Sequence, residues 1–321
     1  MSRIKLVAVG LAVAFAAMHG VAHAQTAFPT KPVRILVHTA AGSGSDLMAR
    51  ELGKVLEGHL GQPVVIENRT GGGGAVALTH LLGQPADGYT VSVITMSQIM
   101  TMAAGRLGQI RQPDQLTWLA RVQGDPILIV VRTDSPLKSV RDLNARVKEA
   151  AASGNLLKIG SYGRKTHYEA AVLDYAQAVG ARVNYIAYEG TPEILRAVLG
   201  GEIDVAFAPA SGSMANLEGG TIRPLASLSA GPVPGLAAVP TLKESGIDVV
   251  VMQYRGLVAK PGMPAEVLAK WETALKAAVV DPRLAKATEQ EGMVLLADVG
   301  HEALLPIVTR EFEKAKAALG Q

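Results

Sequence analysis

Apolar runs and helical patterns alternate along most of the chain. Residues 33–39, VRILVHT, form a nearly unbroken apolar run, which is typical of a parallel strand buried on both faces. Residues 45–60 then place leucine, methionine and valine close to helical spacing, and Gly61 ends that pattern. The same alternation continues at 63–69, 73–84 and 88–95. It predicts an α/β fold with parallel strands and right-handed crossovers.

A second series of the same kind begins near residue 127. Strands are expected at 127–133, 157–162, 183–188 and 203–209, with helices at 139–152, 166–180 and 191–201 between them. Two series of similar length predict two doubly wound lobes rather than one sheet.

The remainder of the chain is expected to complete the first lobe. A segment rich in proline and glycine, 231–246, leads to an apolar stretch and then to helical patterns. The chain would then cross between the lobes twice and leave a cleft between them. We expect residues 25–124 together with 229–321 in the first lobe, and residues 125–228 in the second.

The first 24 residues have the pattern of a secretory signal peptide. Arg3 and Lys5 precede the apolar run LVAVGLAVAFAAM, and Ala22 to Ala24 supply small residues for a processing peptidase. The run is too short to span a bilayer comfortably, and an uncleaved anchor is the alternative. We expect cleavage after Ala24 and an exported mature protein.

Composition removes several classes of function. The chain has no cysteine, which excludes disulfides, thiolate metal sites and cysteine nucleophiles. The net charge is +3, and Lys and Arg are scattered among Asp and Glu, so we expect no nucleic-acid partner. The sequence lacks the motifs GxSxG, HExxH and GxxxxGK[ST], and no run of His, Asp and Glu has metal spacing. We expect no catalytic residue, no metal and no cofactor.

Glycine and small hydroxyl residues gather where strands pass into helices. The clearest case is HTAAGSGSDLMAREL, residues 38–52. In a doubly wound sheet, ligands bind at the carboxyl ends of the strands, and the free N–H groups of a helix N-terminus attract anions. Gly42 and Gly44 allow close approach of the backbone to a ligand, and Ser45 or Asp46 can cap the helix. A small carboxylate or phosphate suits such a site.

Similar junctions follow the other expected strands, at 67–77, 94–99, 160–170, 187–194 and 207–216. Polar loops that converge from two lobes describe a closing binding site. Each feature also has a purely structural alternative. Glycines serve as tight turns, Asp46 as a helix cap, and Arg164 and Lys165 as solvated surface residues.

A partial dinucleotide-binding motif is the best candidate for an enzyme. ILVHTAAGSGSD follows a strand and opens a helix, and Glu67 lies at the end of the next strand. Counting from Gly42, however, the third glycine position falls on Leu47. An exported oxidoreductase is therefore the least favoured alternative.

Several segments, in their order, resemble the solute-binding proteins of the tripartite tricarboxylate transporter system, the Bug family. They are FPTKPVRILV, GSGSDLMAREL, LGQPVVIENRTGGGG, PADGYT, YIAYEGTPEILRAVLGGEIDVAF, VPTLKESG and GLVAKPGMPAEVL. The resemblance implies a periplasmic, monomeric two-lobe protein of the type II binding-protein class. Such a protein closes on a small carboxylated solute and delivers it to a membrane permease. Presentation of the ligand to a sensory receptor is the alternative.

The resemblance also implies where the ligand is held. In that family, the loop after the first strand and a loop of the second lobe grip the ligand, partly through backbone amides and ordered water. Carried over by position, the first lobe contributes Thr39, Ala40, Gly42, Ser43, Gly44, Ser45, Asp46, Gly73, Thr95 and Ser97. The second lobe contributes Ser161, Gly163, Arg164, Thr166, His167, Tyr188, Gly190, Thr191 and Ala208.

The chain departs from the family pattern in its candidate site. TAAGSGSD lacks the paired prolines and the glycine pair that usually precede the aspartate. Ala208 stands where many members carry an acidic residue. Residues 253–255 occupy the place, before the glycine of the C-terminal strand, where the family has a tryptophan-like residue. The loss of an acid, with Arg164, Lys165 and Arg255 nearby, favours an anionic ligand such as a di- or tricarboxylate.

Overall fold

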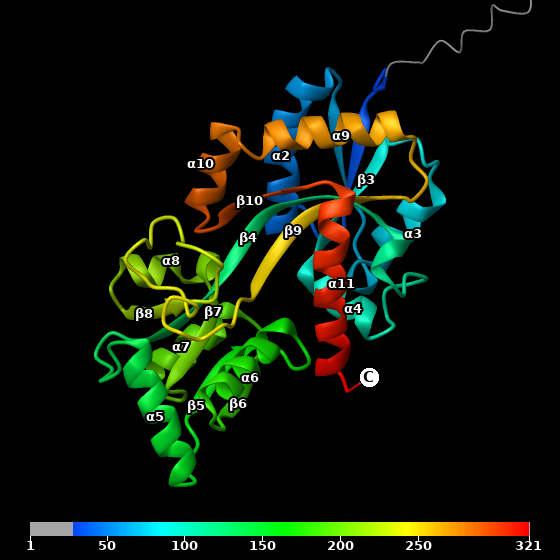
Figure 1. Cartoon of the computed structure of the whole chain (residues 1–321). Helices are drawn as coiled ribbons and strands as arrows, with labels where there is room; N and C mark the ends of the chain where they lie inside the picture. The colour runs from blue at the N-terminus through cyan, green and yellow to red at the C-terminus, as the bar shows by residue number, and fades with distance from the viewer. Residues whose placement is uncertain (1–27, 321) are drawn as a thin grey trace, which may run out of the picture.

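One long strand, β4, joins two groups of strands in a mixed sheet (Figure 1). The computed structural model describes residues 28–320. The strands are β1 (Val33–Val37), β2 (Val64–Asn68), β3 (Thr90–Thr95), β4 (Thr117–Arg132), β5 (Lys158–Tyr162), β6 (Asn184–Tyr188), β7 (Val205–Pro209), β8 (Ile222–Ser227), β9 (Met252–Ala259) and β10 (Val294–Val299). Their order is β2-β1-β3-β9-β4-β7-β5-β6, and β8 and β10 each pair with β4.

Helices cover both faces of the sheet in each group. They are α2 (Gly44–Leu60), α3 (Ala75–Gly83), α4 (Met96–Ala103), α5 (Val140–Ala152), α6 (His167–Val179), α7 (Thr191–Gly200), α8 (Ala210–Glu218), α9 (Ala265–Ala278), α10 (Pro282–Gln290) and α11 (His301–Ala318). Two short 3-10 helices, η1 (Gly72–Gly74) and η2 (Pro113–Gln115), lie in loops. We call β1, β2, β3, β9, β10 and the part of β4 before Ile127 lobe 1. Lobe 2 contains β5 to β8 and the rest of β4.

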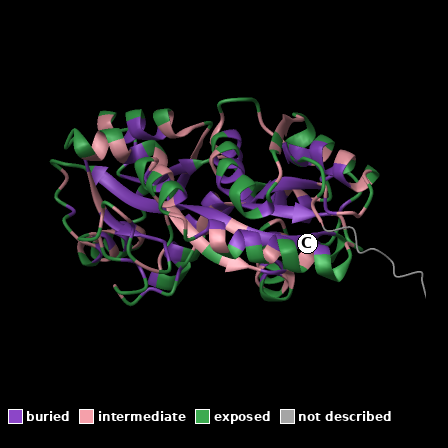
Figure 2. Cartoon of the chain, turned by 90° about the horizontal axis from the view of Figure 1, so that it is seen from above, coloured by how far each residue is buried: buried purple, intermediate pink, exposed green. Residues whose placement is uncertain are grey.

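Each lobe has its own apolar layers. In lobe 1, Leu52 of α2 and Trp271 of α9 pack on one face of the sheet, and Phe312 of α11 packs with α4 on the other. In lobe 2, Tyr175 of α6 and Ile194 of α7 belong to two separate clusters. Full burial of one such side chain stabilises the fold by about 1.5 to 3 kcal/mol. Figure 2 shows the buried strands through the middle, with exposed helix surfaces outside.

Strand directions point the loops of both lobes at the junction between them. β1, β2 and β3 are parallel, and β9 is antiparallel to both β3 and β4, so β4 runs in the same direction as β1 to β3. β5, β6 and β7 are parallel to one another, and β7 is antiparallel to β4. The carboxyl ends of β1 to β3 therefore point towards lobe 2, and those of β5 to β7 point towards lobe 1.

β4 changes its partner at the junction. Pro126 pairs with the first residue of β9, whereas Ile127 pairs with Pro209, the last residue of β7. Arg255 of β9 pairs with both Thr95, the last residue of β3, and Gln123. At about 3.3 Å per residue, the ends of β3 and β7 lie about 13 Å apart along β4.

The structure has the α/β fold with two doubly wound lobes that the alternating pattern predicts. The pattern missed β8, β10, α4, α8 and the first part of β4. The expected lobe boundary at residue 125 falls inside β4, and the lobe bounds stay a prediction. Within residues 28–320, no helix has the length and apolar character needed to cross a bilayer. The expected signal peptide lies outside the described residues.

Candidate functional site

The loop between β1 and α2 is organised by its own aspartate. The Asp46 carboxylate accepts hydrogen bonds from Gly42 N–H at 2.8 Å, from Arg50 at 2.9 and 3.0 Å, and from Asn68 Nδ2 at 2.9 Å. The hydrogen-bonded Arg50 guanidinium is the main cause that lowers the pKa of Asp46 to about 2. Asp46 is 1% exposed. This carboxylate therefore holds the loop in shape.

Ser43, and not Ser45 or Asp46, is the N-cap of α2. Its backbone is extended, and its hydroxyl accepts from Asp46 N–H at 3.4 Å. The expectation that Ser45 or Asp46 is the cap is wrong, because the helix begins at Gly44, two residues earlier. Thr39 supports the cap, since its hydroxyl hydrogen-bonds that of Ser43.

Two N–H groups at the start of α2 are free within the part of the chain that the structure describes. Gly44 N–H and Ser45 N–H have no hydrogen-bond acceptor there, whereas Ser43 N–H donates to Ala40 O at 3.2 Å. The helix dipole adds positive potential at this end. Among the predicted residues, Gly44 and Ser45 therefore offer the donors that an anion needs.

The two neighbouring loops of lobe 1 pack against each other. Gly71 to Gly74 all have positive φ, a conformation that favours glycine. A Cβ on Gly74 would lie 2.1 Å from Gln98 Nε2, so the Gln98 amide lies directly against this loop. Gln98 Oε1 accepts from Thr95 N–H at 2.9 Å, while its buried Nε2 has no partner among the described residues. Gly73 and Ser97 are exposed beside them.

In lobe 2, Thr166 is the N-cap of α6. Its hydroxyl accepts from Glu169 N–H at 3.2 Å and donates to Tyr162 O at 2.7 Å. Arg164 pairs with Glu169 at 3.3 Å and is 67% exposed, and Lys165 N–H also donates to the Glu169 carboxylate. The positive charge expected at this loop is therefore partly neutralised by Glu169.

The other predicted residues of lobe 2 fall into two groups. Ser161 and Ala208 are fully buried in strands, and the Ser161 hydroxyl donates to Phe207 O at 2.6 Å. Gly163, Tyr188, Gly190 and Thr191 are half-buried at the ends of β5 and β6. Their contribution to ligand binding stays a prediction.

Sequence reasoning missed a buried acid at the junction. Asp125 of β4 is 6% exposed, and its carboxylate accepts from Ser211 N–H at 3.1 Å and from the Ser211 hydroxyl. Burial raises the pKa of Asp125. This carboxyl group occupies the N-terminus of α8, so the chain's own oxygens accept hydrogen bonds at one of the helix starts. The sequence did contain a signal for this residue, since Asp125 is a charged residue within a largely apolar strand.

A groove of about 740 Å³ lies between the lobes. Met96 and Met100 of α4 line it from lobe 1, and Thr166 and His167 line it from lobe 2, with residues 248–252 and the end of α11 completing it. His167 is 4% exposed, and its two ring nitrogens have no partner among the described residues. Burial lowers the pKa of His167 to about 3, so the ring is neutral at neutral pH.

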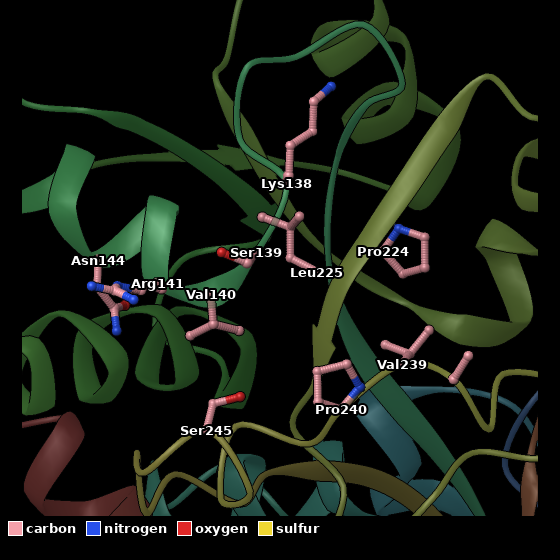
Figure 3. A pocket seen from close by; sticks show the side chains of 11 residues that line it. Lys138, Ser139, Val140, Arg141, Asn144, Pro224, Leu225, Val239, Pro240 and Ser245 are labelled. Atoms are coloured by element: carbon pink, nitrogen blue, oxygen red, sulfur yellow. The ribbon is translucent and has the colours of Figure 1, made fainter.

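A second cavity, of about 720 Å³, lies in lobe 2 at the start of α5 (Figure 3). Arg141, Asn144, Pro240 and Ser245 are among its lining residues, and none of the predicted ligand residues is. Among residues 28–320, no group of three or more histidine or acidic side chains is arranged to hold a metal ion. Of the predicted ligand residues, Thr166 and His167 line the groove between the lobes, and the loop from Thr39 to Asp46 lines neither the groove nor this cavity.

Comparison with known proteins places these features in a family. Residues 48–314 match the profile of TctC, described as the tripartite tricarboxylate transporter family receptor. The chain belongs to this family. A UPF0065 protein from Cupriavidus necator is 30% identical over 282 residues, covering 88% of this chain and 84% of the relative. The protein BugT of Bordetella pertussis is 27% identical over 267 residues, covering 82% and 80%.

Solved structures agree with this membership. A TctC solute-binding protein from Polaromonas, solved without ligand, is 26% identical, with a TM-score of 0.82 over 91% of this chain and 99% of that one. MatC from Rhodopseudomonas palustris with bound malate is 23% identical, with a TM-score of 0.65 over 91% and 100%, and shares the fold. The family consists of solute-binding receptors, so the oxidoreductase alternative is excluded.

Proposed function

We propose that this TctC-family protein captures a small carboxylate between its lobes in the periplasm and delivers it to a membrane permease. The observation that carries the proposal is the pair of N–H groups at Gly44 and Ser45, without acceptors among the described residues, at a helix start that faces the other lobe. A carboxylate accepts such donors well, and each charge-assisted hydrogen bond contributes about 1.5 to 3 kcal/mol. A few of them reach micromolar affinity, about 8 kcal/mol.

Closure follows from contacts with both lobes. A ligand that touches the loops of lobe 1 and lobe 2 together stabilises the closed arrangement over the open one. The moving units in this proposal are residues 25–124 with 229–321, and residues 125–228. The working form is a monomer released by cleavage after Ala24, and Thr166 with His167 supplies the opposing helix start.

A thermal-shift screen of the mature protein tests the proposal. The probes are mono-, di- and tricarboxylates, amino acids and nucleotides, and they include malate and adipate, because proteins of this fold have been solved with these two acids. A probe at a hundred times its Kd adds about 2.7 kcal/mol to the stability of the folded state. Stabilisation by a carboxylate is expected. Stabilisation by nucleotides alone, or by no probe, would contradict the proposal.

A glycine variant locates the site. In Gly44→Val, the new Cβ would lie 2.4 Å from Arg255 Nη2, so the guanidinium must move away from the start of α2. We expect this variant to lose stabilisation by the carboxylate. Gly58→Val is the matched control, because Gly58 lies on the same helix and a Cβ added to it would meet no atom within 4 Å. Equal stabilisation of both variants would place the site elsewhere.

Delivery to a permease is tested separately. Membrane proteins are captured on the immobilised mature protein with and without the stabilising carboxylate. Recovery of a permease subunit that depends on the carboxylate is expected, and recovery of a receptor instead would favour a sensory role.

A further inference from the structure

Arg255 lies where the first loop of lobe 1 meets the strands that join the lobes. It pairs along the sheet with Thr95, at the end of β3, and with Gln123 of β4. Its side chain is 15% exposed. The guanidinium lies against Gly44, since a Cβ on Gly44 would be 2.9 Å from Arg255 Cζ. A full positive charge is thus placed at the helix start where Gly44 and Ser45 N–H have no acceptor within residues 28–320.

The guanidinium has more donors than the surrounding residues accept. Arg255 Nη1 donates to Gln123 Oε1 at 3.2 Å and to Met293 Sδ at 2.6 Å. Among the described residues, Nε and Nη2 have no acceptor within hydrogen-bond distance. A guanidinium presents five N–H donors in a planar fork, and thioether sulfur is a weak acceptor. Most of the hydrogen-bonding capacity of this largely buried cation is therefore unused.

No carboxylate of the described residues forms a close pair with Arg255. The carboxylate oxygen that pairs with it, Glu291 Oε2, lies 4.0 Å from Nη1, at the limit of an ion pair. The Asp125 carboxylate is turned to Ser211. A largely buried charge is costly unless an anion contacts it directly.

The guanidinium is also held in place. Gln123, which accepts from Nη1, is 1% exposed and donates through Nε2 to Thr288 Oγ1 at 2.9 Å. This chain of hydrogen bonds fixes the amide, and the amide fixes one side of the fork. The Nε and Nη2 edge of the guanidinium, which lies against Gly44, is the part without an acceptor among the described residues.

We propose that Arg255 is the specificity-determining residue for the ligand, and that one ligand carboxylate binds between its free N–H groups and those of Gly44 and Ser45. This inference rests on the proposed function and deepens it, because it requires a full negative charge at that end of the ligand. Glu291 is the internal competitor, and it attracts the same guanidinium weakly when no ligand carboxylate is bound.

The test is calorimetric titration of the mature protein with succinate, malate, adipate and citrate, and with the diamide of the acid that binds tightest. Wild type is expected to bind at least one acid and to reject its diamide. Arg255→Gln should weaken that acid by about 10- to 100-fold, because charge-assisted hydrogen bonds are lost. Arg255→Lys should lie between the two, since it keeps the charge without the fork.

Two further variants separate the inference from damage to the fold. Glu291→Gln should bind the acid about 2- to 5-fold tighter, because the competing charge is removed. A destabilised protein would not gain affinity. Arg283→Gln is the matched control, since this exposed arginine of α10 pairs with Asp281 and its loss gives the same change in net charge. Its affinity should equal that of wild type.

The outcomes distinguish the two proposals. If wild type binds an acid and Arg255→Gln binds it equally well, the role of Arg255 is overturned and the proposed function stands. Weaker binding of the acid by Glu291→Gln would overturn the proposal that Glu291 competes with the ligand carboxylate for Arg255. If no carboxylate of the thermal-shift screen or of this titration binds wild type, the proposed function fails and the inference fails with it.

Discussion

Two buried aspartates, Asp46 and Asp125, lie beside helix starts and have opposite pKa shifts. Asp46 belongs to α2 itself and contacts a cation, Arg50, which lowers its pKa to about 2. Asp125 comes from β4 and contacts α8 through Ser211, without a directly bonded cation, and burial raises its pKa. The comparison teaches that burial alone destabilises a carboxylate, and that a directly bonded guanidinium reverses the sign.

The same comparison separates the two helix starts. At α8, the chain's own carboxylate accepts the first N–H groups. At α2, the aspartate turns back into the loop and accepts from Gly42 N–H, so Gly44 and Ser45 keep their donors. The α8 start shows, within this molecule, how a carboxylate fits such a junction. The α2 start has N–H donors of the same kind, without acceptors among the described residues, and in the proposed function a ligand carboxylate takes that place.

Asp46→Asn should have the largest effect on stability. It removes a charged acceptor that takes hydrogen bonds from Gly42, Arg50 and Asn68. We expect a loss of about 3 kcal/mol in the free energy of unfolding by urea at pH 7. Asp142→Asn is the control, since this acid lies in the first turn of α5. Its loss should stay near 1 kcal/mol or below, and equal losses would remove the special role of Asp46.

The fall in the free energy of unfolding at acid pH measures the contribution of Asp46 independently. Its pKa in the folded state lies below the unfolded value, so its contribution is complete above about pH 4 and is lost as the pH falls towards 2. Urea titrations should show this loss in wild type and not in Asp46→Asn. If the free energy of unfolding falls equally with pH in wild type and in Asp46→Asn, the lowered pKa of Asp46 is contradicted.

The start of α6 is a third case, because its first residue, His167, carries a buried and neutral ring. Its pKa is lowered to about 3, so stability falls as the pH drops below 6.5, because only the unfolded state takes up the proton. His167→Phe should reduce the loss between pH 7 and pH 5 by about 2 kcal/mol. The ring already packs against that of Tyr168 in a tilted arrangement, with centroids 4.2 Å apart, so phenylalanine should fit.

The pH dependence of His167→Phe decides whether His167 causes this loss of stability. An unchanged pH dependence in His167→Phe would show that His167 does not cause this loss, and His38, whose pKa burial lowers to about 4, would remain as its source.

The sequence predicts the fold well where its pattern is apolar and regular. The alternation of strands and helices yields the two lobes, because parallel strands covered on both faces leave an unmistakable run of apolar residues. β8 and β10 were missed for physical reasons. β8 contains Pro224 inside IRPLAS, and β10 is only half-buried along VLLADV, so neither shows a clean strand pattern.

The candidate site is predicted only in outline. Glycines and hydroxyls mark the loops, but which carboxylate pairs with which cation depends on contacts between distant segments. Arg50 and Asn68 commit Asp46 to the loop, and no local pattern indicates this. Arg255 and Gly44 are 211 positions apart in the chain (255 minus 44) and meet through the order of the strands. Contacts of this kind can be predicted only when the order of the strands is known.

Asp125→Asn should have the smallest effect, and its sign tests the comparison. Because the pKa of Asp125 is raised in the folded state, its ionised form opposes folding as the pH rises above the unfolded pKa. Asparagine keeps an oxygen for Ser211 N–H and carries no charge to desolvate. We expect stability at pH 7 to stay within about 1 kcal/mol of wild type, with the variant gaining relative to wild type from pH 4 to pH 7. A loss as large as that of Asp46→Asn would mean that Asp125 is held by a cation after all, and Arg255 would then be its partner and unavailable to a ligand.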